Sequence, residues 1–470
     1  MDVTRSNTES LSPRIDAVMA EIRRRISSRT LTPGAKLPSV RALAKILAVS
    51  TSTVVEAYER LVAEGAIRSR PGSGFYVASA LAPLSLADIG PRLDRAVDPF
   101  WVSRLALDPR EDIAKPGCGW LPPSWMPEEA LRKALRNLSR AQSSILTDYG
   151  TPLGLLPLRQ LLARRMAENG LAVGADQLLL VDSGTQAIDH VCRFLLEPGQ
   201  TVLVDDPCYF NFHALLRAHR VKVVGVPYSA DGPDVALFER ALEEHGPRLY
   251  ITNSAIHNPT GAVLSPVNAH RILMLAERAG LTIIEDDIFA DFEITKAPRL
   301  AVFDGLNRVV QIGSFSKTLS ASARCGYVAA RKEWMEPLVD MKIAANFAAS
   351  QLSEALVLEV LKDGSYWRHM EALKVRLSKA RAELIPILKT LDIQPWIEPR
   401  SGIFLWCRLP HGVDAATVAR HALNENMVLA PGNVFSQSEA ASGFMRFNVS
   451  QCDHPKFVEI LRQAIAASRT

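Results

Sequence analysis

The sequence predicts a two-part protein: a small helical domain that ends in a β-hairpin, followed by a much larger α/β domain. Three observations lead to this prediction. Three amphipathic segments and a glycine-rich turn occupy the first eighty of 470 residues. From Asp176 onward, short apolar runs alternate with helical stretches. Positive charge is also unevenly placed, since residues 1–80 hold 12 lysines and arginines against 7 aspartates and glutamates, whereas the remainder is close to neutral.

The bulk composition, 48% hydrophobic and 22% charged, is that of an ordinary globular protein. No apolar run is long enough to span a bilayer, and the N-terminal stretch lacks the apolar core of a signal peptide. The six cysteines are scattered, with no C-x-x-C pair. We therefore expect a cytoplasmic protein without a disulfide framework, a metal site or a membrane partner.

The first eighty residues have the pattern of a winged helix-turn-helix, which we place at residues 11–78. A first helix follows Pro13 and carries apolar residues at helical spacing. Ser39 is expected to cap a second helix, and Ser50 a third helix that ends at Gly65. Residues 66–77 then predict a β-hairpin, because its two short strands flank the turn sequence PGSG.

This small domain is predicted to bind double-stranded DNA. The third helix offers Thr51, Ser52 and Thr53 at its N-terminal end, where a recognition helix meets base edges and phosphates. The basic excess of the same eighty residues supports that partner. The alternative is a small helical packing domain with solvated arginines, but the pattern, the charge and the turn chemistry together favour DNA.

The segment KLPSVRALAKILAVSTSTVVEAYERLVAEGAIRSRPGSGFYV (36–77) resembles the GntR-type DNA-binding domain along its whole length. The resemblance implies contacts to DNA from both helices and from the wing. One departure is Thr51, where the family often has arginine, so the resemblance does not predict the operator sequence. The implied DNA-binding residues are Ser39, Arg41, Ser50, Thr51, Ser52, Thr53, Gly72 and Gly74.

Residues 79–115 are predicted to be a linker, because they mix Ala, Leu, Pro, Asp and Arg without sustained periodicity. Pro83, Pro91, Pro99 and Pro109 interrupt any long helix. A linker of roughly 35 residues spans up to ~120 Å when extended, which is enough to reach a partner subunit.

Beyond the linker, the chain predicts an α/β sheet covered by helices on both sides, with a smaller α+β part at the end. Buried strands are expected at 178–181, 201–204, 248–252, 281–284 and 309–312, and a helix at 185–196. Polar segments follow these strands: SGTQ (183–186), HNPTG (257–261), EDD (285–287) and SFSK (314–317). Each alone is more often a cap or a turn. In combination they predict a phosphate site at a helix start and a nucleophilic amine, Lys317.

Together these segments resemble the fold-type I aminotransferases that use pyridoxal 5′-phosphate, over residues 116–470. The resemblance implies a large part at about 147–350 and a small part at about 351–470 plus 116–146. By that resemblance Lys317 forms the internal aldimine with the cofactor, and Asp286 pairs with the pyridine nitrogen. Lys317 and Asp286 are thus the implied catalytic residues.

The same resemblance implies the remaining contacts of the cofactor. Asn258 bonds the phenolic oxygen, Tyr209 stacks on the ring, and Arg446 binds the α-carboxylate of an amino acid substrate or effector. The family commonly has tyrosine three residues after the aspartate, where this chain has Phe289. The implied phosphate contacts are Ser183, Gly184, Thr185, Gln186, Ser314, Ser316, Arg324 and, from the other subunit, Tyr149.

A GntR-like domain joined to an aminotransferase-like body is typical of the MocR/GabR group of transcriptional regulators, which KPGCGWLPPSWMP (115–127) also resembles. The leading hypothesis is a homodimeric, cofactor-dependent regulator that senses an amino compound, or the cofactor itself, through the Lys317 aldimine. The alternative is a functional aminotransferase acting on an amino acid, with an accessory DNA-binding domain. An inactive scaffold is the third interpretation.

Overall fold

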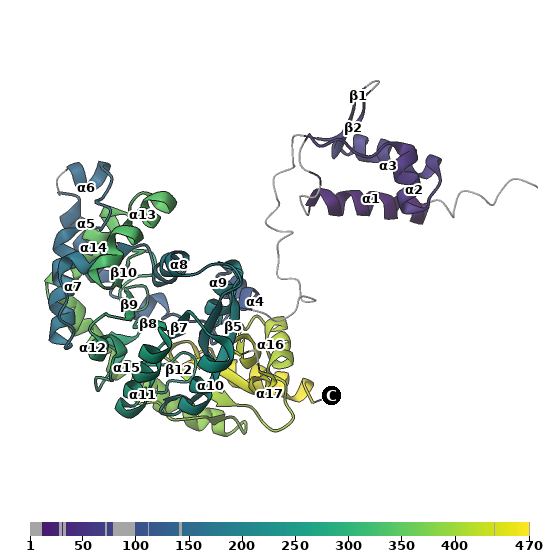
Figure 1. Cartoon of the computed structure of the whole chain (residues 1–470). Coiled ribbons are helices and arrows are strands. Elements are labelled where there is room, and N and C mark those ends of the chain that lie inside the picture. The colour runs from purple at the N-terminus through teal and green to yellow at the C-terminus, as the bar shows by residue number, and fades with distance from the viewer. Residues whose placement is uncertain are drawn as a thin grey trace, which may run out of the picture. The chain divides into compact units, whose positions relative to one another are not determined.

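The computed structural model describes residues 12–27, 31, 34–70, 73–78, 99–110, 112–140, 143–436 and 438–469. The chain divides into two compact units, Met1–Arg92 and Leu93–Thr470, and each is described by itself (Figure 1). Most of the predicted linker and Gly72 of the predicted wing lie outside the described residues. In the described part of the chain, no helix is long and apolar enough to cross a membrane.

The first unit is a winged helix-turn-helix, as predicted. Its three helices pack around one apolar core, in which Val54, Tyr58 and Leu61 of the third helix are fully buried. The Tyr58 hydroxyl donates to the carbonyl of Pro38 at 2.8 Å, so the buried ring keeps a polar partner. The elements are α1 (Ser12–Ser27), α2 (Val40–Leu47), α3 (Thr51–Ala63), β1 (Ile67–Arg70) and β2 (Gly74–Val77), the two strands pairing antiparallel.

Serine caps set the tight turn between α2 and α3. The Ser39 side chain accepts from the Ala42 amide at 3.2 Å, and Ser50 accepts from the Thr53 amide at 3.1 Å. Between the two helices Ala48 adopts a left-handed conformation (φ 52°), which ends α2 and redirects the chain. Both predicted caps are confirmed, and they fix where the third helix begins.

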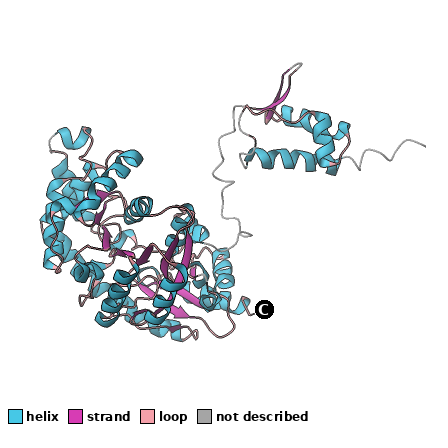
Figure 2. Cartoon of the chain, viewed as in Figure 1, coloured by secondary structure: helices cyan, strands magenta, loops and turns pink. Residues whose placement is uncertain are grey.

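The second unit is built on an eight-stranded sheet with the order β3-β10-β9-β8-β7-β4-β5-β6. Helices surround the strands of this unit (Figure 2). In the part of the sheet with the order β9-β8-β7-β4-β5, each pair of neighbouring strands is parallel. Strand β10 runs antiparallel to both β9 and β3. The predicted strands are present, but β5, β6 and β10 were not expected. The strands are β3 (Leu178–Val181), β4 (Thr201–Asp206), β5 (Lys222–Ser229), β6 (Gly232–Pro233), β7 (Leu249–Thr252), β8 (Thr282–Asp286), β9 (Val309–Ser314) and β10 (Gly326–Ala329).

Helices cover both faces of this sheet, which confirms the predicted α/β class. Successive strand residues enter two different cores: Leu178 and Leu180 of β3 join one cluster, and Leu179 and Val181 join the other. Helices α8 and α13 contribute to the second cluster, and α10 and α11 to the first. The helices are α7 (Leu156–Glu168), α8 (Gly184–Leu195), α9 (Phe210–Ala218), α10 (Val235–His245), α11 (Pro266–Ala279), α12 (Leu300–Asp304) and α13 (Met335–Asn346).

A smaller α+β part follows, as the sequence predicts. Its four-stranded antiparallel sheet has the order β11-β12-β14-β13. Helix α5 packs against α14, although more than 200 residues separate them in the chain. The elements are α5 (Glu128–Leu138), α6 (Ser143–Thr147), α14 (Gln351–Lys362), α15 (Ser365–Lys389), β11 (Gln394–Pro395), β12 (Phe404–Arg408), α16 (Ala415–Asn424), β13 (Ala430–Pro431), β14 (Phe444–Asn448) and α17 (Phe457–Ala467).

The last part of the predicted linker is structured. Residues Pro99–Ala106 form helix α4, which begins at a proline and packs against α9. Its apolar residues Trp101, Val102 and Leu105 are buried in the main core. Further on, the Ala114 amide donates to the carbonyl of Asn426 at 2.9 Å. The sequence did not predict α4, because a helix of 8 residues is too short to show a sustained apolar periodicity.

We expect Ser50→Ala to loosen the start of α3 without unfolding the protein. Loss of an N-cap hydroxyl costs about 1 kcal/mol, so the α3 amides should exchange with solvent hydrogen roughly fivefold faster. Hydrogen exchange of the full chain, read on peptides covering Thr51–Ala63, measures this. Ser50→Asp, which keeps an acceptor, and Ser69→Ala on exposed β1 are the controls; unchanged α3 exchange in Ser50→Ala would contradict the capping role.

Candidate functional site

A cavity of about 500 Å³ lies at one edge of the eight-stranded sheet. Strands β4, β7, β8 and β9 all end at this edge because they are parallel, and the turns after them carry the polar segments noted in the sequence. The cavity is lined by Ala106, Leu107, Lys115, Gly119, Trp120, Ser183, Gly184, Thr185, Ile188, Tyr209, Asn258, Asp286, Ile288, Phe289, Ser314, Ser316, Lys317, Ala321 and Arg324.

Lys317 lies three residues past the end of β9, on the turn that opens into the cavity. Its amine forms no hydrogen bond or ion pair with a described residue and lies 5.8 Å from the centre of the Trp120 ring. Burial lowers the pKa of this amine to about 8, with a further lowering by the charge of Arg446. A larger fraction of the amine is therefore neutral near pH 7.5 than for an ordinary lysine, as a nucleophile requires.

Asp286 ends β8, and the alternation of a strand separates it from the two acids beside it. Asp286 lines the cavity, whereas Glu285 and Asp287 do not, as expected of alternate positions along a strand. The Ile288 amide donates to the Asp286 carboxylate at 3.2 Å. Burial raises the pKa of Asp286 to about 6, so a cationic partner in the cavity would favour its ionised form.

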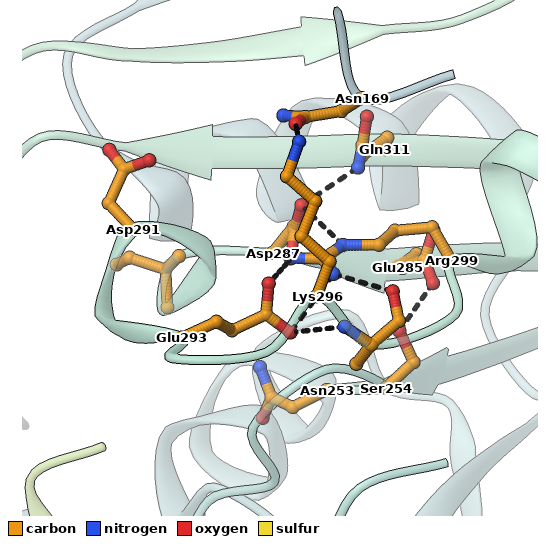
Figure 3. A network of polar contacts seen from close by, with 12 residues as sticks. Asn169, Asn253, Ser254, Glu285, Asp287, Asp291, Glu293, Lys296, Arg299 and Gln311 are labelled. Carbon is orange, nitrogen blue, oxygen red and sulfur yellow. Dashed lines mark hydrogen bonds and ion pairs between the residues drawn. The ribbon is translucent and has the colours of Figure 1, made fainter. Parts of the chain in front are cut away.

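The acids on the far side form a buried network that holds the end of β8 in place (Figure 3). Glu285 accepts from the Leu300 and Ala301 amides at 2.7 and 2.9 Å. Asp287 pairs with Arg299 at 3.1 Å and accepts from Gln311 at 2.9 Å. These bonds join the residues on either side of Asp286 to α12 and β9, and so fix its direction.

Arg446 on β14 lies behind the cavity wall, beside the lining residues Asn258 and Gly119. Its guanidinium is fully buried, donates to Asn258 Oδ1 at 2.8 Å and to the Gly117 carbonyl at 2.7 Å, and lies 4.2 Å from the centre of the Phe404 ring. Burial lowers its pKa to about 10. The Nε atom has no hydrogen-bond partner in the described part of the chain, so this cation keeps a donor to offer.

The opposite end of the cavity carries the chemistry of an anion site. Ser183 caps α8, so the first residues of that helix, Gly184 and Thr185, lie with their backbone amides at the cavity wall. Ser314 and Ser316 hydroxyls lie 3.0 Å apart beside them. Arg324 lines the same region, is exposed, and holds a left-handed backbone (φ 44°).

The structure does not bring every predicted residue to the cavity. The Gln186 side chain folds back and accepts from the Asp182 amide at 2.6 Å, which removes it from the lining. Tyr149 is 85% exposed and stacks on Phe347 at 5.8 Å between ring centres, away from the cavity of its own chain. Its role in a second subunit stays a prediction.

Among the lining residues to which the sequence assigned no role are Lys115, Gly119 and Trp120. They belong to the segment KPGCGW, which the Ala114 and Gly117 amides pin to Asn426 and Val428 of the small part. The position of this segment depends on contacts made more than 300 residues away. The glycines and the tryptophan of KPGCGW are the sequence features that could have marked this segment as part of the site.

The predicted DNA-binding residues lie in the first unit. Arg41, Thr51 and Ser52 are exposed, as are the capping residues Ser39 and Ser50. Thr53 is buried at 2% exposure, and its hydroxyl lies 2.7 Å from that of Ser50, so it serves the helix start instead of facing outward. Gly74 opens β2 with φ 109°, which favours glycine. Exposed lysines and arginines on the same unit include Lys36, Lys45, Arg68 and Arg70.

Two solved aminotransferases are similar to this chain. LysN, an α-aminoadipate aminotransferase from Thermus thermophilus complexed with N-(5′-phosphopyridoxyl)-L-leucine, is 26% identical, with a TM-score of 0.70 over 82% of this chain and 98% of that one. An archaeal alanine:glyoxylate aminotransferase is 25% identical, with a TM-score of 0.71 over 78% of this chain and 93% of that one.

Curated relatives match nearly the whole chain. The HTH-type transcriptional regulator YdcR of Escherichia coli K12 is 29% identical over 440 residues, 92% of this chain and 93% of that protein. NorG of Staphylococcus aureus USA300, also an HTH-type transcriptional regulator, is 28% identical over 86% of this chain and 93% of its own. Residues 14–77 match the gntR family of bacterial regulatory proteins, and residues 122–464 match aminotransferase class I and II. The chain therefore belongs to the aminotransferase class I and II family, with a gntR-family regulatory domain ahead of the aminotransferase domain.

Proposed function

We propose that this protein is a pyridoxal 5′-phosphate-dependent transcriptional regulator that binds double-stranded DNA and senses an amino compound through Lys317. The observation that carries the proposal is the presence, in one chain, of a winged helix-turn-helix and of a cavity where Lys317, Asp286 and Asn258 converge. The names of YdcR and NorG as regulators support the same conclusion.

The residues of the cavity fit the proposed cofactor. When bound, pyridoxal 5′-phosphate supplies an aldehyde carbon and an electron-withdrawing ring. Lys317 offers an unpaired amine of lowered pKa, and Asp286 offers a buried carboxylate for the ring nitrogen. Asn258 already gives its oxygen to Arg446, which leaves its amide to donate to the phenolic oxygen.

The anion end suits the phosphate group. Hydroxyls of Ser314 and Ser316, the start of α8 and the Arg324 guanidinium together offer donors and positive charge to a dianion. Gly326 supports this end from behind, since a Cβ there would lie 2.8 Å from the Ser183 backbone. In a homodimer, which we also propose, the exposed Tyr149 would be available to the site of the partner.

A working aminotransferase is the second candidate, and the buried Arg446 beside Lys317 favours it. Against it stands Phe289, which is 4% exposed and packs on Phe404 at 5.5 Å between ring centres. No hydroxyl is available from that residue to the cofactor's phenolic oxygen. Steady-state turnover with a panel of amino and keto acids separates the candidates: rapid turnover without specific DNA binding would overturn the regulator.

The first prediction concerns Lys317. Full-length protein incubated with pyridoxal 5′-phosphate and reduced with borohydride should carry the reduced cofactor's mass on the peptide that contains Lys317. Lys317→Ala should carry none, and Lys332→Ala, at an exposed lysine paired with Asp176, should label like the wild type. Label on another lysine, or no label, would contradict the assignment.

The second prediction concerns DNA. Wild-type protein should protect a site in the region upstream of its own or a neighbouring gene in a footprinting experiment. Arg41→Ala should bind more weakly and show a salt slope smaller by about one, because one phosphate contact is lost. Arg132→Ala, at an exposed arginine paired with Glu128 on α5, is the control. Equal slopes for wild type and Arg41→Ala would exclude Arg41 from the contact.

The third prediction concerns Asp286 and pH. The folded-state pKa of about 6 lies above the ordinary 3.8. The free energy of unfolding of the cofactor-free protein therefore falls as the pH rises through this interval, and it stays lower at higher pH. Asp286→Asn removes this cost, which corresponds to about 3 kcal/mol. It should raise the urea midpoint of cofactor-free protein at pH 8, much less near pH 4, and weaken cofactor binding.

Asp340→Asn, at an exposed acid on α13, is the matched control and should change neither property. A cofactor-free Asp286→Asn protein that is no more stable than wild type at pH 8 would mean that the carboxylate is not held in a low-dielectric position. Unchanged cofactor affinity would remove Asp286 from the proposed pairing with the ring.

A further inference from the structure

One wall of the cavity is made by the segment that leads from α4 into the small part, residues 106–110 and 112–120, which we name the entry segment. Ala106, Leu107, Lys115, Gly119 and Trp120 of this segment line the cavity. Gly119 marks how close the wall comes to the reactive groups: a Cβ there would lie 3.8 Å from Arg446 Nη2 and 4.0 Å from Lys317 Nζ. A ligand held between Arg446 and Lys317 therefore lies against the entry segment.

Positive charge dominates this region. Among the described residues that line the cavity, Lys115, Lys317 and Arg324 are cationic groups and Asp286 is the carboxylate. Arg446 adds a further cation beside the lining residue Gly119. The charges of Lys115, Lys317 and Arg446 each lower the pKa of the Cys118 thiol, against the rise that its burial causes.

The proposed function gives a partner to each of these charges except one. Arg324 faces the cofactor's phosphate, Asp286 its ring nitrogen, Lys317 its aldehyde carbon, and Arg446 an α-carboxylate. Lys115 remains. Its ammonium donates to the Asp108 carbonyl at 2.5 Å, whereas the Asp108 carboxylate is bonded by Arg110 at 3.2 Å. Lys115 thus forms no ion pair with a described residue, although it is partly buried.

We propose that Lys115 binds a second acidic group on the effector, which makes the effector an amino acid with an acidic side chain. The inference rests on the proposed function, because it takes the α-carboxylate to lie on Arg446. An ammonium on a flexible four-carbon stem suits this task, because it can reach side chains of different length. On binding, it would exchange the Asp108 carbonyl for the charged carboxylate of the ligand, which is a stronger acceptor. The neutral analogue lacks that charge and gains nothing from Lys115.

The test compares acidic amino acids with neutral counterparts on full-length, cofactor-loaded protein. L-Aspartate, L-glutamate and L-2-aminoadipate are titrated beside L-asparagine, L-glutamine and L-norleucine, and binding is followed by calorimetry and by the absorbance of the cofactor. At least one acid should bind wild type roughly tenfold or more tightly than its neutral counterpart. Lys115→Met should bring that ratio to about one while keeping the affinity for the neutral ligand.

Lys332→Met, at an exposed lysine outside the cavity, is the matched control and should keep the wild-type ratio. The affinity of cofactor-free Lys115→Met for pyridoxal 5′-phosphate is measured in parallel. A large loss there, or an equal loss for acids and amides, would assign Lys115 to the cofactor or to the fold and overturn the inference.

The outcomes also separate this inference from the proposed function. Wild-type protein that carries the cofactor on Lys317, and binds glutamine or norleucine as tightly as the acids, overturns the inference alone. Wild-type protein that carries no cofactor on Lys317 overturns the proposed function and the inference with it. An acid preference that Lys115→Met abolishes supports both.

Discussion

A single buried guanidinium holds the second unit together at its site. Arg446 bonds Asn258 of the large part and Gly117 of the entry segment, and it belongs to a strand of the small part. Burying a cation costs less when hydrogen bonds and covered faces compensate for lost solvation, and two of the three guanidinium nitrogens of Arg446 are bonded. Phe404 and Phe435 cover the faces, with ring centres 4.2 and 4.7 Å away. Any displacement among the three segments breaks one of these bonds.

That constraint explains why the reactive side chains lie close together at this edge of the sheet. Arg446 Nη2 and Lys317 Nζ both lie within 4.0 Å of the position of a Cβ on Gly119, so the proposed amino acid ligand would find a carboxylate partner and an amine close together. The far-side network of Glu285, Asp287 and Arg299 does the same for Asp286 by holding the end of β8. The residues that support the site are buried and bonded, whereas Thr185 and Arg324 at the anion end remain exposed.

Much of this arrangement was predictable from the sequence. The strands around 178–181, 282–286 and 309–314 are continuous apolar runs with polar ends, which is how strands buried on both faces look. Because parallel strands end at a common edge, their polar ends had to lie close together. The tight α2–α3 turn was equally readable, since its two serine caps act over three residues.

Other features depend on contacts that the sequence does not encode locally. Strand β10 has only four residues and exists by pairing with β3 and β9. The entry segment takes its position from Asn426 and Val428, so Lys115 had no recognisable role in the sequence. The directions of Gln186 and Thr53 were also missed, because local hydrogen bonds turn both away from the surface that a motif would assign them.

Arg324 combines a backbone conformation that costs stability with a proposed role in anion binding. Its left-handed backbone is a conformation that glycine adopts freely and that costs other residues about 1 kcal/mol. The loop therefore carries a local backbone cost in the cofactor-free protein. The same residue that has this cost would offset it when its guanidinium binds an anion. If the proposed phosphate binds Arg324, cofactor binding and the order of this loop would be thermodynamically linked, and the occupied protein would gain rigidity just before β10.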